Sequence, residues 1–474
     1  MASLVAPPTP EDFGTVLLGK LPFEPTRQQT QLTAALARFF TSGPQEAVFM
    51  LNGYAGTGKT SMVGALVKTL QHYRVPTVLL APTGRAAKVF ASMAGRNAYT
   101  IHRHIYRMQG VDGGFRLALN TKPGTVFIVD EASMISNVAS ELTGGSLLED
   151  LLQHVFTSDG CRLVLLGDTA QLPPVGTSLS PALDLKYMRG FGLPVVRAGM
   201  TATVRQAANS GILVNATRLR TLMAAKDNRQ LPPPQISSRG FGDVTDVDSC
   251  DLADVLAGAY RRDGVDNTIL ITRANFAATQ ANLIIRNQVL GYEEELVRGE
   301  RLMVVKNNYA VTRKVPGVDF IANGDSLIVR AIHGMESLHG LRFANVTVGL
   351  GDDTASPDID CKILLDTLTS NSPAADPAAW RMFKERMIAE LGSDAPRGAV
   401  AALLREDPYI NALQVKYAYA VTCHKAQGGQ WINVFLDRGA LHPLPDEDML
   451  DTYRWVYTAI TRATRRLYMV GHSD

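Results

Sequence analysis

The chain has 474 residues, which is more than a single hydrophobic core usually supports, so its length predicts two or more domains. Hydrophobic residues make up 46% and charged residues 19%, a balance that is typical of globular proteins and supplies ample material for cores. The net charge of +2 excludes a general basic field, so any binding of nucleic acid has to use a local groove of lysines and arginines.

The cysteines and the apolar runs indicate in which cellular compartment the protein is expected. The four cysteines, Cys161, Cys250, Cys361 and Cys423, are far apart and form no CxxC pair. This spacing argues against a zinc ribbon, an iron–sulfur cluster or a disulfide framework, and it fits a reducing compartment. The N-terminus lacks the pattern of a signal peptide, and no window approaches the roughly 18 continuous apolar residues that a membrane span needs. We therefore expect a soluble, cytoplasmic protein that does not contact a membrane.

The first half of the chain alternates short apolar runs with helical stretches. The runs VFMLNG, TVLLAP, TVFIVDE and RLVLLGD predict buried strands at residues 48–53, 77–82, 125–131 and 162–168. Helical patterns lie between them, notably at Thr60–Tyr73 and Thr83–Met93. This alternation predicts an α/β fold with a parallel sheet covered on both faces. The conspicuous motifs stand where the strands stop, which is where such sheets bind ligands.

A second α/β unit is predicted in the other half. The expected strands are TILIT, KYAYAVT, NVFLD and RLYMVG, at residues 268–272, 416–422, 433–437 and 466–471. Helices are expected from Asn275 to about Leu290 and near Met449–Thr461. The stretch from about 310 to 410 interrupts this unit with strand-like runs, SLIVRAI and ANVTVGL, and then a looser helical part. We interpret it as a small inserted β-rich module.

The segment GYAGTGKT, from Gly53 to Thr60, fits the phosphate-loop pattern in its required context, after an apolar strand and before a helix. Its glycines let backbone N–H groups converge on phosphate oxygens at a helix N-terminus. Lys59 is expected to reach the β- and γ-phosphates, and the Thr60 hydroxyl to ligate Mg²⁺. A glycine turn without nucleotide is the disfavoured alternative. The predicted ligands are ATP and Mg²⁺, and the predicted nucleotide-binding residues of the loop are Gly53, Ala55, Gly56, Thr57, Gly58, Lys59 and Thr60.

Further polar residues at strand ends match the needs of phosphoryl transfer. Asp130 and Glu131 end the third strand, where one carboxylate can hold Mg²⁺ and the other can orient or deprotonate the attacking water. Gln171 follows the fourth strand, where its amide can contact the γ-phosphate. Arg205 and Arg462 are candidate arginine fingers. Taken singly, an Asp-Glu pair is often only a solvated strand end, and a surface ion pair is the favoured interpretation of either arginine. It is the combination of these residues that favours catalysis.

The order of the motifs resembles the superfamily 1 helicases, in detail the RecD-like and Dda-like branch called 1B. The resemblance runs from about Thr26 to Val470. The motifs that carry it are PTRQQ, APTGRAAK, TIHR, VDEASM, LLGDTAQLPPVG, TVRQ, TCHKAQG and YTAITRA. It implies two RecA-like parallel-sheet domains, with a small hairpin insertion in the first and a β-rich, SH3-like insertion in the second. The implied boundaries are an N-terminal extension at 1–25, the first RecA-like domain at 26–195 with a hairpin at about 103–124, the second at 196–309 and 411–474, and the SH3-like subdomain at 310–410.

The resemblance also assigns roles to further residues. Gln29 is implied to read the adenine ring, and Arg205 and Arg462 to reach the phosphate loop from the second domain when ATP closes a cleft. The implied direction of movement is 5′ to 3′. The residues implied to line a channel for single-stranded DNA are Pro82, Thr83, His102, Thr422 and His424.

Two positions depart from the family pattern. Dda-type members carry a histidine where this chain has Gly84, so one implied DNA contact is missing. The hairpin, which is the pin that splits the duplex in this family, has a Gly113–Gly114 tip without proline. Asp112–Gly113 suits a tight turn, although a surface hairpin with only packing value is the alternative. The aromatic residues that could stack on bases, or simply fill the core, are Tyr99, Tyr106, Phe115, Tyr309 and Trp431.

The main functional hypothesis is an ATP-dependent DNA helicase that moves 5′ to 3′ on single-stranded DNA. It is expected to act as a monomer and to unwind tailed or forked duplex DNA. An alternative is a motor that remodels RNA or RNA–DNA hybrids, because the motifs do not clearly read the 2′-hydroxyl. Another is a non-translocating, ATP-gated DNA clamp, against which TCHKAQG and the hairpin argue.

Overall fold

A computed structural model describes residues 8–109, 114–139, 144–202, 209–225, 231–313, 315–316, 318, 320–351, 356–392, 395–445 and 447–471. The chain forms two compact units. The first consists of Met1–Gly242 with Pro443–Thr461, and the second of Asp243–His442 with Arg462–Asp474.

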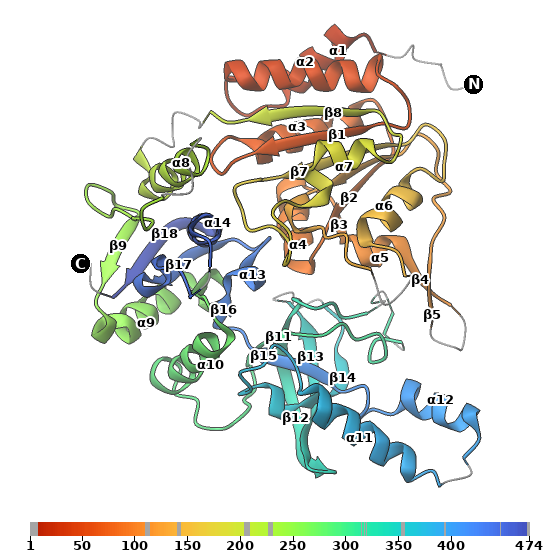
Figure 1. The fold of residues 1–474 in the computed structure, drawn as a ribbon, viewed down its shortest axis with the longest axis vertical. Helices are drawn as coiled ribbons and strands as arrows, with labels where there is room; N and C mark the ends of the chain where they lie inside the picture. The colour runs from red at the N-terminus through yellow and green to blue at the C-terminus, as the bar shows by residue number, and fades with distance from the viewer. Residues whose placement is uncertain are drawn as a thin grey trace. The chain divides into compact units, whose positions relative to one another are not determined.

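The first unit is built on a six-stranded parallel sheet in the order β3-β2-β6-β7-β1-β8 (Figure 1). Its strands are β1 Val48–Gly53, β2 Thr77–Ala81, β3 Ala98–Thr100, β6 Val126–Val129, β7 Arg162–Gly167 and β8 Val195–Met200. Alternate residues of β1 enter two different cores, Phe49 on one side and Met50 on the other. Because successive side chains of a strand point to opposite faces, helices must cover both faces of this sheet, as the sequence predicts.

The helices of the first unit are α1 Pro10–Gly19, α2 Arg27–Thr41, α3 Lys59–His72, α4 Gly84–Ala94, α5 Ile101–Ile105, α6 Leu147–Val155, α7 Leu185–Arg189, α8 Gly211–Met223 and α14 Met449–Ile460. Phe13 and Leu17 of α1 are buried in the same core as α2 and α3, so the predicted N-terminal extension contributes to this unit. Helix α14, which the sequence suggests for the second domain, belongs to the first unit in the structure.

A separate two-stranded hairpin follows α5 in the chain and precedes β6. It consists of β4 Tyr106–Gln109 and β5 Gly114–Leu117, which pair in antiparallel register. The hairpin insertion predicted near 103–124 is therefore present. Its predicted turn at Asp112–Gly113 lies outside the described residues.

The second unit combines another parallel sheet, in the order β16-β10-β17-β18-β9, with a closed barrel. The sheet strands are β9 Val244–Val247, β10 Thr268–Thr272, β16 Ala420–Thr422, β17 Trp431–Asp437 and β18 Ala463–Val470. The helices next to it are α9 Leu252–Asp263, α10 Asn275–Ile284, the π-helix Ile285–Val289 and α13 Cys423–Ala426.

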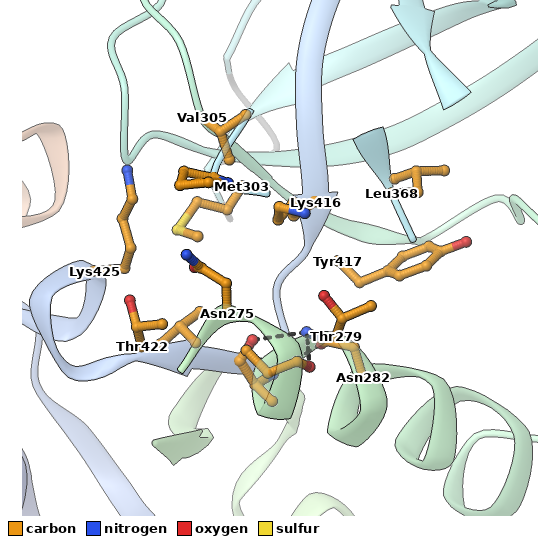
Figure 2. A pocket seen from close by; sticks show the side chains of 14 residues that line it. Asn275, Thr279, Asn282, Met303, Val305, Leu368, Lys416, Tyr417, Thr422 and Lys425 are labelled. Atoms are coloured by element: carbon orange, nitrogen blue, oxygen red, sulfur yellow. Dashed lines mark hydrogen bonds between the residues drawn. The ribbon is translucent and has the colours of Figure 1, made fainter. Parts of the chain in front are cut away.

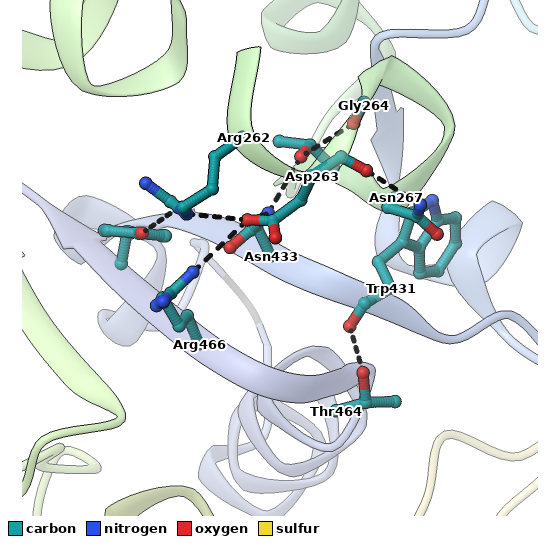
Figure 3. A network of polar contacts seen from close by, with 10 residues as sticks. Arg262, Asp263, Gly264, Asn267, Trp431, Asn433, Thr464 and Arg466 are labelled. Carbon is teal, nitrogen blue, oxygen red and sulfur yellow. Dashed lines mark hydrogen bonds and ion pairs between the residues drawn. The ribbon is translucent and has the colours of Figure 1, made fainter. Parts of the chain in front are cut away.

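A polar network ties α9 to the strands of this sheet (Figure 3). The carboxylate of Asp263, at the end of α9, accepts hydrogen bonds from Asn433 Nδ2 at 3.0 Å, Arg262 Nε at 2.9 Å and Arg466 Nη1 at 3.2 Å. The bond from Asn433 and the two guanidinium groups lower the pKa of Asp263. One carboxylate thus fixes the helix end against β17 and β18.

The barrel contains β11 Arg301–Val304, β12 Ser326–Leu338, β13 Leu341–Leu350, β14 Ile359–Leu364 and β15 Leu413–Tyr417. Two helices, α11 Pro377–Ala389 and α12 Arg397–Glu406, stand between β14 and β15. The predicted β-rich insertion is confirmed. Its first and last strands lie outside the range 310–410.

One predicted strand, KYAYAVT at 416–422, is wrong. Its beginning closes the barrel in β15 and its end joins the sheet as β16. The chain turns at Tyr419, where the buried Asn282 Oδ1 accepts hydrogen bonds from the backbone N–H groups of Tyr419 and Ala420, each at 2.9 Å. An apolar, β-prone run does not reveal such a break, because Asn282, which bonds to the backbone at the break, comes from helix α10.

Among the described residues, no helix is both long and apolar enough to cross a membrane.

Candidate nucleotide site and nucleic-acid interface

The phosphate loop joins the end of β1 to the start of α3, as predicted. Gly56 and Gly58 have φ of +73° and +80°, the left-handed region that glycine tolerates best. A Cβ at Gly56 would also lie 2.9 Å from Leu213 Cδ2 of α8. The N-cap residue of α3 is Gly58, which has no side chain to cap the helix. The loop therefore presents a helix N-terminus with the geometry that suits an anion.

Lys59, the first residue of α3, faces the acidic end of β6. Its Nζ lies 3.8 Å from Asp130 Oδ1, and the two side chains are 15% and 17% exposed. Glu131 follows with φ of +53°, a strained conformation for a residue with a Cβ, and its backbone N–H donates to Asp130 Oδ1 at 2.8 Å. Strain of this kind is often kept where it aims a functional side chain. The structure thus places Lys59 beside Asp130, which stands about 70 residues further along the sequence.

The residues present also fit a magnesium ion. Asp130 and Thr60 offer a carboxylate and a hydroxyl, the hard oxygen donors that Mg²⁺ prefers, and Mg²⁺ takes its remaining ligands from phosphates and water. Thr60 is the second residue of α3, directly after Lys59.

Asp168, at the end of β7, is a buried acid beside the loop that the sequence reasoning passed over. Its Oδ2 accepts a hydrogen bond from the hydroxyl of Tyr457 in α14 at 2.6 Å. The same hydroxyl accepts a hydrogen bond from the backbone N–H of Ala55 in the phosphate loop at 3.0 Å. Burial raises the pKa of Asp168, while the charge of Lys59 and the bond from Tyr457 act in the opposite direction. The position of Asp168 directly after an apolar strand was a usable signal, whereas nothing local marks Tyr457.

Gln171 lies in the turn after Asp168 and is 6% exposed. Its buried Oε1 has no hydrogen-bond partner among the residues that the structure describes. A buried carbonyl oxygen without a partner is costly, so it marks a place where a ligand or water is expected.

Gln29, the predicted adenine contact, makes hydrogen bonds within the first unit. Its side chain is fully buried, Oε1 accepts from the backbone N–H of Thr26 at 2.8 Å, and Nε2 donates to the carbonyl of Thr57 at 3.4 Å. The amide therefore closes a capping box on α2 and links that helix to the phosphate loop. Oε1 can accept a second hydrogen bond and Nε2 can donate a second one, so the predicted contact with adenine stays a prediction.

Helix α8 supplies further neighbours of the loop that sequence reasoning missed. Besides the contact of Leu213 with Gly56, the guanidinium of Arg220 lies over the ring of Tyr54, 4.6 Å from its centroid. Arg205, one predicted finger, lies outside the described residues.

The order of strands separates the two kinds of predicted residue in the first unit. The carboxyl ends of β1, β7 and β6 carry the loop, Gln171 and Asp130, whereas β2 and β3 carry the predicted DNA contacts. Pro82 and Thr83 follow β2 and are half-buried, and the Thr83 hydroxyl caps α4 by accepting from Ala86 N at 3.2 Å. His102 lies in α5, and burial lowers its pKa. The sheet thus brings each group together at its own part of one edge.

In the second unit, Thr422 ends β16 and His424 lies exposed in α13. Thr422 lines a pocket between the sheet and the barrel (Figure 2). Asn275 and Met303 also line it, together with Lys425, which bonds to Asn323 Oδ1. Burial lowers the pKa of Lys425. Polar groups of several elements therefore meet where a DNA contact was predicted.

Arg462, the other predicted finger, is buried in the second unit, directly before β18 in the chain. Its Nη1 donates to the carbonyl of Gly429 at 3.3 Å, and its own carbonyl accepts from Trp431 N at 2.9 Å. Trp431 and Tyr106 are buried, so these two aromatic residues belong to the cores, while Tyr99 is exposed.

Two known domain families match this chain. An AAA domain matches residues 26–213, and a UvrD-like helicase C-terminal domain matches residues 417–470. The first match includes the phosphate loop, Asp130 and Gln171, and the second includes Thr422, His424 and Arg462.

Individual relatives agree with these families. ATP-dependent RecD2 DNA helicase of Deinococcus radiodurans is 35% identical over 165 residues, which are 35% of this chain and 20% of that protein. ATP-dependent DNA helicase dda of Enterobacteria phage T4 is 25% identical over 292 residues, 60% of this chain and 62% of that protein. The chain thus spans less than two thirds of the length of either relative.

Among solved structures, Pif1 helicase from Bacteroides in complex with ADP-AlF3 and ssDNA is 16% identical, with a TM-score of 0.44 and coverage of 94% of this chain and 92% of its own. Separate parts of this chain are thus similar to known families, residues 26–213 to an AAA domain and residues 417–470 to a UvrD-like helicase C-terminal domain.

Proposed function

We propose that this chain is an ATP-dependent DNA helicase that hydrolyses ATP to ADP and phosphate and moves 5′ to 3′ along single-stranded DNA. The observation that carries the proposal is the approach of Lys59 to Asp130 beside a phosphate loop, in a chain that also holds a UvrD-like helicase C-terminal domain. Tailed and forked duplexes are the proposed substrates. The protein is proposed to act inside the cell as a monomer.

The proposed chemistry uses the edge of the first sheet. Lys59 and the loop N–H groups bind the β- and γ-phosphates, and Glu131 orients the attacking water. Asp130 and Thr60 hold Mg²⁺, which when bound neutralises charge on the phosphate oxygens. The unpartnered Oε1 of Gln171 supports a place for its amide near the γ-phosphate or the water.

The proposed motion couples the two units. Arg205 and Arg462 are proposed to neutralise charge on the transferred phosphoryl group once ATP closes the domains on each other. Pro82, Thr83 and His102 in the first domain, and Thr422 and His424 in the second, are proposed to hold the DNA strand in turn. Reopening after hydrolysis would then shift the grip along the strand.

A strand-displacement assay on 5′-tailed, 3′-tailed and forked duplexes tests the proposal. We expect single-stranded DNA to stimulate ATP hydrolysis strongly and the 5′-tailed and forked duplexes to be unwound. Lys59→Ala is expected to lose both activities, because the phosphates lose their cation. Unwinding of 3′-tailed duplexes alone would contradict the direction, and unwinding by Lys59→Ala would contradict the mechanism.

Two further measurements separate the alternatives. Matched DNA and RNA oligonucleotides show whether the ATPase prefers DNA, and stronger stimulation by RNA would favour the RNA motor. Displacement of streptavidin from a biotinylated DNA end reports directional movement, and ATP-dependent binding without displacement would favour the clamp.

A further inference from the structure

Both ends of the β4–β5 hairpin are bonded to the same helix, α6. The hydroxyl of Tyr106, the first residue of β4, donates to Asp150 Oδ2 at 2.6 Å. The carbonyl oxygen of Ala118, directly after β5, lies 2.6 Å from His154 Nδ1. A carbonyl cannot donate, so Nδ1 carries the proton of this bond. Asp150 and His154 are four residues apart and therefore share one face of α6.

The two bonds lie in the interior of the first unit. Tyr106, Asp150 and His154 are 5%, 6% and 4% exposed. The ring of His154 packs edge-on against Phe127 of β6, with centroids 5.7 Å apart. A buried hydrogen bond is expensive to leave unmade, because water does not replace the lost partner. The base of the hairpin is therefore held by contacts that resist opening.

Helix α6 is itself firmly attached. Ser146 and Glu149 form a capping box at its start, with bonds of 3.3 Å and 2.9 Å. Leu148 and Leu151 are fully buried in the core under the sheet. A third bond, from Asn120 Nδ2 to the carbonyl of Val155 at 3.3 Å, ties the chain after the hairpin to the end of the same helix. The helix thus joins the hairpin to the body of the sheet.

We propose that Asp150 and His154 are positioning residues that hold the hairpin rigid, so that movement along DNA separates the strands instead of bending the hairpin aside. The proposal rests on the function proposed above and on the role that the resemblance implies for this hairpin, that of the pin that splits the duplex. A wedge transmits force only if its base is stiffer than the base pairs that it opens. The two legs of the hairpin are fixed by groups spaced one helical turn apart, which constrains both its position and its tilt.

Three substitutions and a control test this clamp. Tyr106→Phe removes the hydroxyl but keeps the ring, including its contact with His102, and His154→Phe removes the donor but keeps an aromatic ring. Asp150→Asn retains an acceptor oxygen and is expected to behave like the original protein. Tyr73→Phe, which removes a hydroxyl at the end of α3, is the matched control.

The first measurement is hydrogen exchange of the amides in β4 and β5. Tyr106→Phe and His154→Phe are expected to exchange about tenfold faster there, the scale of one lost buried hydrogen bond. The second is the number of base pairs unwound per ATP on a 5′-tailed duplex. It is expected to fall about tenfold in both variants, while the ATPase stimulated by single-stranded DNA stays within about twofold.

The outcomes are distinct. Unchanged exchange in both variants would overturn the clamp, whatever the enzyme does. Faster exchange with an unchanged number of base pairs unwound per ATP would overturn the role of the clamp in strand separation. The same conclusion would follow if Asp150→Asn lowered the number of base pairs unwound per ATP as Tyr106→Phe does. If the original protein does not unwind a 5′-tailed duplex, the proposed function fails, and hydrogen exchange still decides whether the hairpin is clamped.

Discussion

The two parallel sheets of this chain carry different chemistry at their carboxyl ends. In the first sheet, charged groups that follow different strands come together, as Lys59 after β1 does with Asp130 after β6 at 3.8 Å. In the second sheet, Thr422 and Asn275 offer neutral polar groups, and burial lowers the pKa of the nearby Lys425.

Strand–helix alternation is common to both sheets, so the fold alone does not account for the difference. It arises in the few residues after each strand. A phosphoryl transfer needs charges held in place, which the first edge supplies, whereas tracking a strand needs polar contacts that release easily. The comparison predicts that substitutions beside the phosphate loop of the first sheet act on turnover and that those around Thr422 of the second sheet act on DNA affinity.

Arg462→Ala is the substitution that would break this division most clearly. If Arg462 is a finger, a residue of the second unit controls chemistry at the first. We expect its loss to lower kcat by roughly 10³-fold or more, with ATP and DNA binding near normal. Steady-state ATPase and nucleotide-binding assays measure this, with the exposed neighbour Arg465→Ala as control. Lost ATP binding or a large fall in Tm would assign Arg462 to structure instead, through its bond to Gly429.

Thr422→Ala and His424→Ala should have the next largest effect and sharpen the comparison. Each variant is expected to bind single-stranded DNA about fivefold more weakly, because a polar contact is worth roughly 1 kcal/mol. Basal ATP hydrolysis should remain, and hydrolysis stimulated by DNA should fall. Fluorescence anisotropy at one fixed salt concentration measures the affinity. Thr464→Ala, on β18 of the same sheet, serves as control. If all three variants bind single-stranded DNA with the same affinity, the result would argue against a DNA contact at Thr422 and His424.

The first unit also carries a response to acid. Burial, then the charges of His154, Arg107 and Lys122, lower the pKa of His104 to about 4. The unfolded chain therefore takes up this proton first, so stability is full above the ordinary pKa of about 6.5 and is lost as pH falls toward 4. Allowing for partial exposure, we expect a loss of about 1–2 kcal/mol between pH 7 and 4.5. Urea unfolding should show this dependence reduced in His104→Asn, and an identical dependence in both proteins would contradict the assignment.

Tyr457→Phe tests the smallest effect, at the loop itself. The Tyr457 hydroxyl occupies the N–H of Ala55 and also bonds to Asp168, and a phosphate arriving at the loop competes for that N–H. Without the hydroxyl, ATP is expected to bind about two- to fivefold more tightly, within the net value of one hydrogen bond. Titration with a fluorescent ATP analogue measures the change. Weaker binding would indicate that Tyr457 instead holds the loop in its binding conformation.

Much of the fold follows from local sequence pattern. The strands at 48–53 and 268–272 begin and end where the apolar runs predict, and the helix after the phosphate loop starts at Lys59, one residue before its predicted start. Short apolar runs and glycine turns specify these elements through interactions between near neighbours. Asp130 could be expected near Lys59, because the strands that carry them are parallel and end at the same edge.

Contacts between distant segments could not be read in this way. The amide of Gln29 bonds to the backbone of Thr26 and Thr57, and Asp168 bonds to a tyrosine 289 residues further along the chain. The run at 416–422 divides between a barrel and a sheet, because Asn282 Oδ1 accepts a hydrogen bond from the backbone N–H of Tyr419. In each case, hydrogen bonds to another element override what the local pattern favours.

By itself, then, the sequence determined the order of strands and helices, the phosphate loop and the residue types at the sheet edges, since these depend on periodicity and turn chemistry. Only the tertiary structure decided which polar groups are already bonded, that α14 packs with the first unit, and that α6 holds both legs of the hairpin. The physical reason is that a buried polar side chain must find a partner, and that partner is chosen by packing in space rather than by distance along the chain.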